Sequence, residues 1–547
     1  MNILFDSTKK EYKNPFGPVV EGETCGFRIL VPAQCGAYRV AWQAEELSVQ
    51  MEKTGTEGPY DVWEGSAVPM KSGLLLYDFA VADKNGSYEL YKQGCGTNMQ
   101  AGEKWQLTVL PRDYAPPEAW RGLVYYQIFP DRFARSGACD LSQKLTPYEL
   151  RDFSTFTPRE KDASDFAGGN LRGITEKLEY LAGLGVGAIY LNPIFMAASN
   201  HRYDTADYLR VDPMLGTDSD FADLCAGAHA HGMRVVLDGV FSHTGADSVY
   251  FDAKGRFRNG AVSAGKASPF YAWYDFQRYP DRYTCWWNVN SLPCVKELNR
   301  DYQTFIFEKV LPKWLSLGAD GFRLDVADEL PDEFIAALRA RLKAIRPDAV
   351  LIGEVWEDAS NKISYGVRRR YFTGGELDGV INYPFRQAIL DYVTGKDGGA
   401  RLAEAVMTLA EHYPAAALDC TMAILGTHDT ERLATLVPDI SDRKLAAFLQ
   451  FALPGSPVVY YGDEAGLSGG RDPMNRLPFP WGREDGALTD FYRQLAVLKN
   501  ESVPLRKGDV EFVEAGGGVV RFRRSAQGQT MECFADAGKK TFGFKRK

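Results

Sequence analysis

The sequence predicts an α/β protein centred on a (β/α)8 TIM barrel, with an inserted subdomain after strand 3, an N-terminal β-sandwich and a small C-terminal β-domain. Three observations support this fold class. Candidate strands alternate with amphipathic helices from Trp120 onward, which is the order that a barrel requires. The residues before that point form short strand-like runs between turns. Finally, 547 residues are too many for one core, so several domains are expected.

The N-terminal region, residues 1–117, has the pattern of an all-β domain. Runs such as CGFRILVP, LLLYDFAV and WQLTVL are separated by Gly, Pro, Asp and Lys-Asn-Gly turns. This spacing is typical of a β-sandwich. The proline-rich segment 111–117 then indicates a domain boundary, because clustered prolines favour loops.

The barrel is predicted for residues 118–490. Eight strands are expected near 123–129, 187–193, 233–238, 320–325, 350–355, 378–382, 421–427 and 456–461. Helices expected between them include 171–185, 220–232, 302–318 and 331–347. The region exceeds the roughly 250 residues typical of this fold. The surplus lies mainly in a Gly-, Tyr- and Trp-rich insertion at about 244–298, which we expect to form a subdomain over the barrel mouth. Short strands predict a small C-terminal β-domain at 491–547.

Charge and cysteine content narrow the class of protein. The formal net charge is -9 and there is no long basic run, which argues against a nucleic-acid partner. No stretch is apolar enough to span a bilayer, and the N-terminus lacks the pattern of a signal peptide. The nine cysteines are scattered without CxxC pairs, which favours reduced thiols in a cytoplasmic protein. Secretion by another route is the weaker alternative.

Charged side chains stand at the ends of four predicted barrel strands, where the reacting groups of this fold lie. They are Asp238 with nearby His243, Arg323 with Asp325, Glu354, and the pair His428 and Asp429. Each has a simpler structural interpretation. A carboxylate can cap a helix or face solvent, a histidine can be a satisfied core group, and an arginine–aspartate pair can be purely structural. Four such groups at one rim are hard to explain as capping alone, so together they favour catalysis.

The chemistry that these residue types suit is glycoside hydrolysis. A retaining enzyme places two carboxyls about 5–5.5 Å apart, and neighbouring strands lie about 4.8 Å apart. Asp325 and Glu354 on adjacent strands could therefore reach that spacing. Arg323 is expected on the same face as Asp325, where its charge would lower the pKa of Asp325 and keep it anionic. The apolar setting of Glu354, LIGEVW, favours its protonated form and suits a general acid.

Four motifs carry a resemblance to a known family: DGVFSH (238–243), GFRLDVADE (321–329), GEVWED (353–358) and GTHDTER (426–432). Flanking segments match as well: VYYQIFPDRF (124–133), YLNPIF (190–195), SNHRYDTADY (199–208), GSPVVYYGDE (455–464) and RDPMNRLPFPW (471–481). In combination these motifs are highly specific. Over about residues 118 to 490 the chain resembles the α-amylase family of glycoside hydrolases, family 13, and within it the neopullulanase/cyclomaltodextrinase branch.

The resemblance implies a role for each matching residue. Asp325 is similar to the family's nucleophile, Glu354 to its acid/base and Asp429 to its third carboxylate. The remaining matches imply substrate contact or support: His243 and His428 as transition-state histidines, Arg323 as the nucleophile's partner, Tyr203 as a platform under the sugar, and Asp204 and Asp238 as supporting residues.

The branch is indicated by softer features. Ala327-Asp328-Glu329 resembles the segment that follows the nucleophile in the neopullulanase branch, so Glu329 is a candidate substrate-binding residue. Trp286 and Trp287 are candidate sugar-stacking surfaces, with subdomain core as the alternative. The branch implies an N-terminal domain that resembles a carbohydrate-binding module and commonly helps to form a homodimer.

No cofactor is expected, and two departures from the family pattern argue against tightly bound calcium. Ser242 stands where many relatives have a calcium-binding Asn, and Asn170 stands where many have Asp. The loop at 134–144 also has few of the oxygen ligands that calcium prefers.

The function that these features predict is a retaining α-glucan hydrolase. Its expected substrates are cyclodextrins, maltooligosaccharides or pullulan, cleaved at α-1,4 bonds with some α-1,6 cleavage. Alternatives are an α-glucan transglycosylase, which intercepts the same intermediate with a sugar, and an α-glucosidase or α-amylase of the same family. A non-catalytic sugar-binding protein is disfavoured, because all three carboxylates and both histidines are present.

Overall fold

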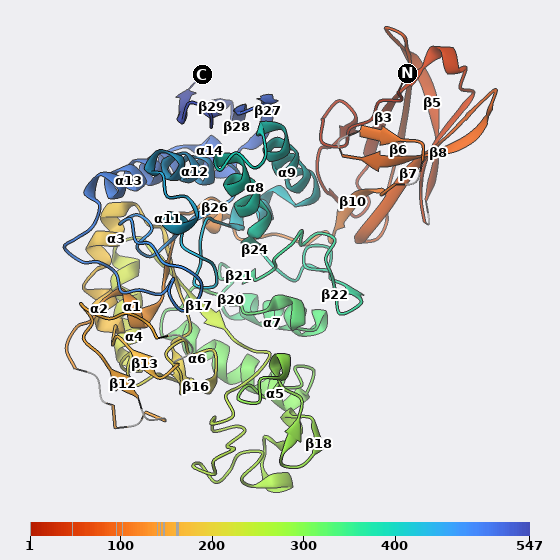
Figure 1. Ribbon diagram of the computed structural model, residues 1–547. Coiled ribbons are helices and arrows are strands. Elements are labelled where there is room, and N and C mark those ends of the chain that lie inside the picture. The colour runs from red at the N-terminus through yellow and green to blue at the C-terminus, as the bar shows by residue number, and fades with distance from the viewer. Residues whose placement is uncertain are drawn as a thin grey trace.

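The structure is a computed structural model that describes residues 2–45, 47–94, 96–100, 102–138, 141–142, 144–145, 148–159 and 163–546. The chain forms an N-terminal β-domain, a central barrel with its helices, and a small C-terminal sheet (Figure 1). The N-terminal domain lies beside the barrel near helices α8 and α9, while the insertion that contains β18 projects from the bottom of the view (Figure 1). Among the described residues, no helix has the length and apolar character needed to cross a membrane.

The N-terminal domain contains ten strands around an aromatic core. They are β1 (Lys13–Asn14), β2 (Val19–Val20), β3 (Cys25–Pro32), β4 (Arg39–Ala44), β5 (Ser48–Glu57), β6 (Tyr60–Ala67), β7 (Gly73–Asp83), β8 (Gly86–Gln93), β9 (Gly96–Asn98) and β10 (Trp105–Leu110). The first part of β5 pairs with β4 and its second part with β6, so this strand joins the two halves of the sheet. Phe27, Trp42, Phe79 and Trp105 pack between those halves, as expected for a sandwich.

Eight parallel strands close the barrel, and each lies within or beside a predicted segment. They are β11 (Tyr125–Ile128), β14 (Ala188–Leu191), β17 (Arg234–Gly239), β20 (Gly321–Leu324), β21 (Val350–Gly353), β24 (Gly379–Asn382), β25 (Met422–Ile424) and β26 (Ser456–Tyr460). Apolar side chains such as Tyr125, Val236, Ile352 and Val458 fill the interior. The barrel is therefore a packed core, and chemistry is confined to its rim.

Helices surround the barrel strands. They are α1 (Pro130–Phe133), α2 (Leu171–Thr175), α3 (Leu178–Leu184), α4 (Asp218–Ala230), α5 (Arg300–Phe305), α6 (Leu311–Ser316), α7 (Asp332–Ile345), α8 (Tyr383–Val393), α9 (Gly399–His412), α10 (Ala415–Cys420), α11 (Leu433–Leu436), α12 (Ile440–Ala452), α13 (Gly486–Glu501) and α14 (Val503–Lys507). A short π-helical segment, Ile306–Val310, joins α5 to α6. The prediction of a single helix at 171–185 is wrong in one respect. The segment divides into α2 and α3 at Lys177, whose backbone is not helical (φ -106°, ψ 6°).

The insertion contains little regular structure. It has short 3-10 turns at Gly265–Ala267, Tyr271–Trp273 and Trp286–Asn288, and a small hairpin of β18 (Phe276–Arg278) and β19 (Arg282–Tyr283). Other short strands form pairs on the barrel's loops: β12 (Glu149–Leu150) with β13 (Asp165–Phe166), β15 (Phe195–Ala197) with β16 (Thr205–Val211), and β22 (Ile363–Ser364) with β23 (Val367–Arg368).

The C-terminal sheet is antiparallel and follows chain order. It consists of β27 (Asp509–Gly516), β28 (Val519–Ala526), β29 (Gln529–Asp536) and β30 (Thr541–Arg546). The runs DVEFVEA, GVVRFRRS and TMECFADA predict the first three of these strands, and the fourth completes the sheet. Seven cysteines in the described part of the chain are free thiols, and the remaining two, Cys95 and Cys139, lie outside the described residues.

Candidate active site

The carboxyl ends of three neighbouring barrel strands bring the predicted acidic residues together. Asp238 is in β17, directly beside Arg323 in β20, and Leu324 of β20 lies beside Gly353 of β21. Asp325 and Glu354 are the residues that follow β20 and β21. Because parallel strands end at one rim, all three carboxyls face the same region of the barrel mouth.

Arg323 is the centre of this group. Its Nη1 lies 2.7 Å from Asp238 Oδ1 and 2.8 Å from Asp325 Oδ1, and its Nη2 lies 2.8 Å from Glu354 Oε2. The arginine side chain is buried. Asp325 and Glu354 are thus held at the two ends of one guanidinium and do not lie on opposite walls.

Burial dominates the acid–base behaviour of this cluster. It raises the pKa of Asp325 well above its ordinary value, and the Arg323 guanidinium opposes this rise while Glu354, Asp238 and Asp429 add to it. The expectation of a net lowered pKa for Asp325 is therefore wrong, although the arginine does act in that direction. The reason is that one guanidinium is shared by three desolvated carboxyls.

Burial also raises the pKa of Glu354, while Arg323 lowers it and the charge of Asp429 raises it further. This agrees with the protonated form predicted from its apolar setting. Two hydrogen bonds act in the opposite direction, because they favour the ionised form. The Val326 amide donates to Glu354 Oε2 at 2.9 Å, and the Trp356 indole donates to Oε1 at 3.2 Å. The cluster can hold one acidic proton beside an ionised carboxylate.

His428 and Tyr203 form the adjoining wall of the site. Their rings stack with centroids 5.4 Å apart, and His428 Nε2 lies 2.5 Å from the Tyr203 hydroxyl. The same hydroxyl donates to Asp238 Oδ2 at 2.8 Å. Burial lowers the pKa of His428 well below its ordinary value, and the nearby Arg476 and Arg323 act in the same direction, so the ring is neutral. Asp429 lies beside it, with its Oδ2 3.1 Å from His428 Nε2.

His243 is also neutral and close to this wall. Burial lowers the pKa of His243 to about 4, and its Nε2 donates to the Tyr203 carbonyl at 3.2 Å. Its Nδ1 lies 2.9 Å from the Ser242 hydroxyl. Asp204 has a different role, because its carboxylate accepts hydrogen bonds from the Ala198 and Ser199 amides. It fixes a loop at the rim.

The remaining predicted residues lie on the insertion and on the turn after Asp325. The indole of Trp287 donates to Glu329 Oε1 at 2.7 Å, and its ring stacks on Trp286 with centroids 5.6 Å apart. Trp286 in turn lies 5.7 Å from the His243 ring. Trp287 is 71% exposed, so the alternative that it is subdomain core is wrong for this residue.

Sequence reasoning missed several residues of the site. Gln127 Nε2 lies 2.9 Å from His428 Nδ1, which leaves Nε2 of the neutral ring as the proton-bearing nitrogen. Asn192 donates to the Tyr203 hydroxyl at 3.1 Å. Trp356 stacks on Tyr383 at 3.8 Å. A signal for Gln127 was present, because it is a polar residue within an otherwise apolar strand.

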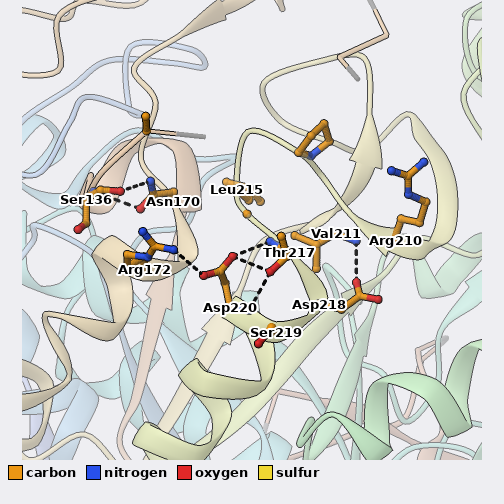
Figure 2. Close-up of a pocket in the computed structure, with 13 residues that line it drawn as sticks. Ser136, Asn170, Arg172, Arg210, Val211, Leu215, Thr217, Asp218, Ser219 and Asp220 are labelled. Atoms are coloured by element: carbon orange, nitrogen blue, oxygen red, sulfur yellow. Dashed lines mark hydrogen bonds and ion pairs between the residues drawn. The ribbon is translucent and has the colours of Figure 1, made fainter. Parts of the chain in front are cut away.

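A cavity lies away from these residues, beside Asn170, one of the positions on which the calcium prediction depends. It has a volume of about 490 Å³ and is lined by Ser136, Asn170, Arg172 and the start of α4 (Figure 2). The side-chain oxygen of Asn170 accepts hydrogen bonds from the amides of Ser136 and Gly173. The Arg172 guanidinium, 3.3 Å from Asp220, adds positive charge.

The contacts of the described residues around this cavity do not fit a calcium site. The Asn170 oxygen holds a turn, the Ser242 hydroxyl contacts its neighbouring histidine, and the cavity already contains a cationic side chain. Among the described residues, no three His, Cys, Asp or Glu side chains are grouped so that they could hold a metal ion. The absence of a calcium requirement stays a prediction.

Comparisons with known proteins agree with this geometry. Residues 127–501 match the family profile "Alpha amylase, catalytic domain". The chain is 34% identical to an amylopullulanase from Thermoanaerobacter thermohydrosulfuricus, over 96% of this chain and 41% of that protein. It is 32% identical to a cyclomaltodextrinase from Geobacillus thermopakistaniensis, over 87% of this chain and 79% of that protein.

A solved structure is similar as well. The ligand-free cyclic α-maltosyl-(1→6)-maltose hydrolase from Arthrobacter globiformis superposes with a TM-score of 0.69 at 30% identity, over 77% of this chain and 92% of that one. The chain spans less than half the length of the amylopullulanases that it matches. Because the family profile covers more than half of the chain, and because the cyclomaltodextrinase match extends over most of both proteins, the chain belongs to the α-amylase family of glycoside hydrolases.

Proposed function

We propose that this protein is a retaining α-glucan hydrolase. The observation that carries the proposal is the position of Asp325 and Glu354 at the two ends of the Arg323 guanidinium. A carboxyl pair of this kind, buried and joined by one arginine, suits a double displacement at a sugar acetal. Family membership supports the same reaction class.

In this mechanism Asp325 attacks the anomeric carbon while Glu354 gives its proton to the departing glycosidic oxygen. The products of this step are a glycosyl ester on Asp325 and a free glucan end. Glu354, now ionised, takes a proton from water, and that water attacks the anomeric carbon. The ester bond breaks, Asp325 leaves as a carboxylate, and Glu354 is protonated again.

The neighbouring residues would bind the sugar. Asp429 and the neutral His428 face its hydroxyls, and Tyr203 supplies a ring beside them. His428 bears its proton on Nε2, 2.5 Å from the Tyr203 hydroxyl, so the neutral ring positions Tyr203 beside the sugar without carrying a charge. By similarity to its relatives, we expect the protein to cleave α-1,4 bonds in cyclodextrins, maltooligosaccharides or pullulan, with some cleavage of α-1,6 bonds.

Three further features belong to the same proposal. The protein is cytoplasmic, in keeping with its free thiols. It forms a homodimer through the N-terminal domain, so light scattering at micromolar concentration should give twice the mass of one chain. It needs no tightly bound calcium, so exhaustive chelation should leave activity unchanged, and activity that is lost and then restored by calcium would contradict this.

The main test is the variant Asp325→Asn. We expect its kcat/KM on maltotriose and β-cyclodextrin to fall at least about a thousandfold, because the amide cannot form the glycosyl ester. Asp281→Asn is the control, since this aspartate is exposed on the insertion. Near-full activity of Asp325→Asn, with an unchanged circular dichroism spectrum, would refute the assignment. The products from maltotriose separate hydrolysis from transglycosylation.

A further inference from the structure

We propose that Trp287 and Tyr365 form an aromatic platform, held by Glu329, that stacks on a sugar ring of the glucan chain on the leaving-group side of the cleaved bond. The inference rests on the proposed function and assigns a substrate-binding surface to the β22–β23 hairpin.

Both rings are costly to hold in place and gain little from packing. Trp287 has φ 45° and Tyr365 has φ 51°, in the left-handed region that bulky residues rarely adopt. Their exposed fractions are 71% and 76%. Strain that burial does not offset points to a role in function, and exposed aromatic faces are suited to stacking on the apolar faces of sugars.

The turn that carries Tyr365 is of a kind that does not favour tyrosine. Tyr365 and Gly366 connect β22 to β23 as a two-residue turn, with φ 51° and 79°. Such turns favour Asn, Asp or Gly at the first central position, because those residues tolerate positive φ. A tyrosine here weakens the turn, so its ring must serve something other than the hairpin's own stability.

A single carboxylate anchors both rings. Glu329 Oε1 accepts a hydrogen bond from the Trp287 indole at 2.7 Å and from the Tyr365 hydroxyl at 3.2 Å. One carboxylate oxygen therefore connects two segments that are distant in sequence. The base of the hairpin is held as well, because Lys362 lies 3.2 Å from Asp328, and Gln106 of the N-terminal domain donates to Ser360.

The platform is connected to the reacting groups through the chain and through ring contacts. Glu329 ends the short turn Ala327–Glu329 that follows Asp325, and the Val326 amide before this turn donates to the Glu354 carboxylate. Glu354 protonates the leaving oxygen, so a surface attached to this turn lies toward the departing part of the glucan. On the other edge, Trp287 stacks on Trp286, which contacts His243.

The test uses Tyr365→Asn, because asparagine is a preferred residue for this turn and should not weaken the hairpin. Isothermal titration of maltoheptaose into the inactive Asp325→Asn protein should show a Kd about three- to tenfold higher when Tyr365→Asn is added, the range for losing one aromatic contact. Tyr365→Phe should raise the Kd by less, since phenylalanine keeps the aromatic ring. The matched control is Tyr38→Asn in the N-terminal domain, where the tyrosine is exposed to a similar extent, 71% against 76%.

Turnover gives an independent measurement. In otherwise wild-type protein, Tyr365→Asn should lower kcat/KM for maltoheptaose more than for maltotriose, by a ratio of about three to ten. Glu329→Ala should reproduce this change in ratio, because it releases both rings. An unchanged affinity for maltoheptaose, together with an unchanged ratio of the kcat/KM values for maltoheptaose and maltotriose, would overturn the proposed platform. A change in oligomeric mass without a change in affinity would also overturn it, and would instead place the rings at a contact between protein copies.

Failure of this inference differs from failure of the proposed function. If Asp325→Asn remains active, the catalytic assignment fails, whatever Tyr365→Asn does to binding. If Asp325→Asn is inactive but binds maltoheptaose equally well with and without Tyr365, only the platform fails.

Discussion

At the scale of single residues, the proton on Glu354 is governed by its hydrogen bonds as well as by burial. The Trp356 indole donates to Oε1, and such a bond stabilises the ionised form and lowers the pKa. Trp356→Phe removes the donor, so the pKa of Glu354 should rise. Because Glu354 must be protonated to act as the acid, the alkaline limb of the pH profile of kcat/KM should move to higher pH.

The control for this prediction is Trp63→Phe. Trp63 is buried in the N-terminal domain, and its indole nitrogen has no hydrogen-bond partner among the described residues. This change should leave the alkaline limb in place. A limb that moves to lower pH in Trp356→Phe would show that the indole does not stabilise the ionised carboxyl.

The sequence predicted which charged residues meet, but not how they share charge. Asp325, Glu354 and Asp238 were identified from the ends of strands, because periodicity reveals those ends. The predicted direction of the net pKa shift of Asp325 was wrong. The sequence shows only the arginine two positions before Asp325, and not the two other carboxyls that contact the same guanidinium. Gln127 was missed for a similar reason, as its partner His428 is remote in sequence.

At the scale of elements, the turn after β20 directs the catalytic groups. Val326 has φ 40° and ψ 52°, which costs a β-branched residue roughly 1–3 kcal/mol. This conformation lets its amide donate to Glu354 while Asp325 contacts Arg323. The strain is therefore tied to the geometry of the site.

Val326→Gly tests this interpretation. Glycine tolerates positive φ, so relief of strain should offset much of the lost side-chain packing, and the free energy of unfolding should change by less than about 1 kcal/mol. The freed backbone should also hold Glu354 less firmly, so kcat should fall. Val49→Gly, in the regular strand β5, is the control, and it should lower stability by more. A larger loss of stability for Val326→Gly than for Val49→Gly in denaturant unfolding would contradict the strain argument.

Element prediction succeeded where local pattern and fold agree. All eight barrel strands were found, since each is a short apolar run between helices. The prediction of one helix at 171–185 was wrong because a tertiary contact decides the shape of this segment. A Cβ on Gly173 would lie 2.3 Å from the Ala134 carbonyl, so α2 is pressed against the preceding loop, and the chain turns before α3 begins. Periodicity alone cannot reveal that contact.

At the scale of the whole molecule, buried polar contacts dock the N-terminal domain on the barrel. Thr108 donates to the His412 carbonyl at 2.9 Å, and Gln106 donates to Ser360 at 2.8 Å. Lys13 of β1 forms an ion pair with Glu411 of α9, and both side chains are almost fully buried. The sequence predicted the seam at 111–117 but not this docking, because Lys13 lies in a polar run that resembles a solvated surface.

The Lys13–Glu411 pair gives a quantitative test of the docking. Lys13→Met leaves the Glu411 carboxylate buried without its cation, which typically costs about 3–5 kcal/mol. We therefore expect a clear fall in the denaturant midpoint. The double variant Lys13→Met, Glu411→Leu should recover most of that loss, because an apolar pair replaces the ion pair.

Lys10→Met is the matched control. Lys10 also forms an ion pair with another domain, through Asp509, but both side chains are exposed. Loss of this pair should therefore cost at most about 1 kcal/mol. Equal effects of Lys13→Met and Lys10→Met would mean that the buried pair does not hold the N-terminal domain on the barrel.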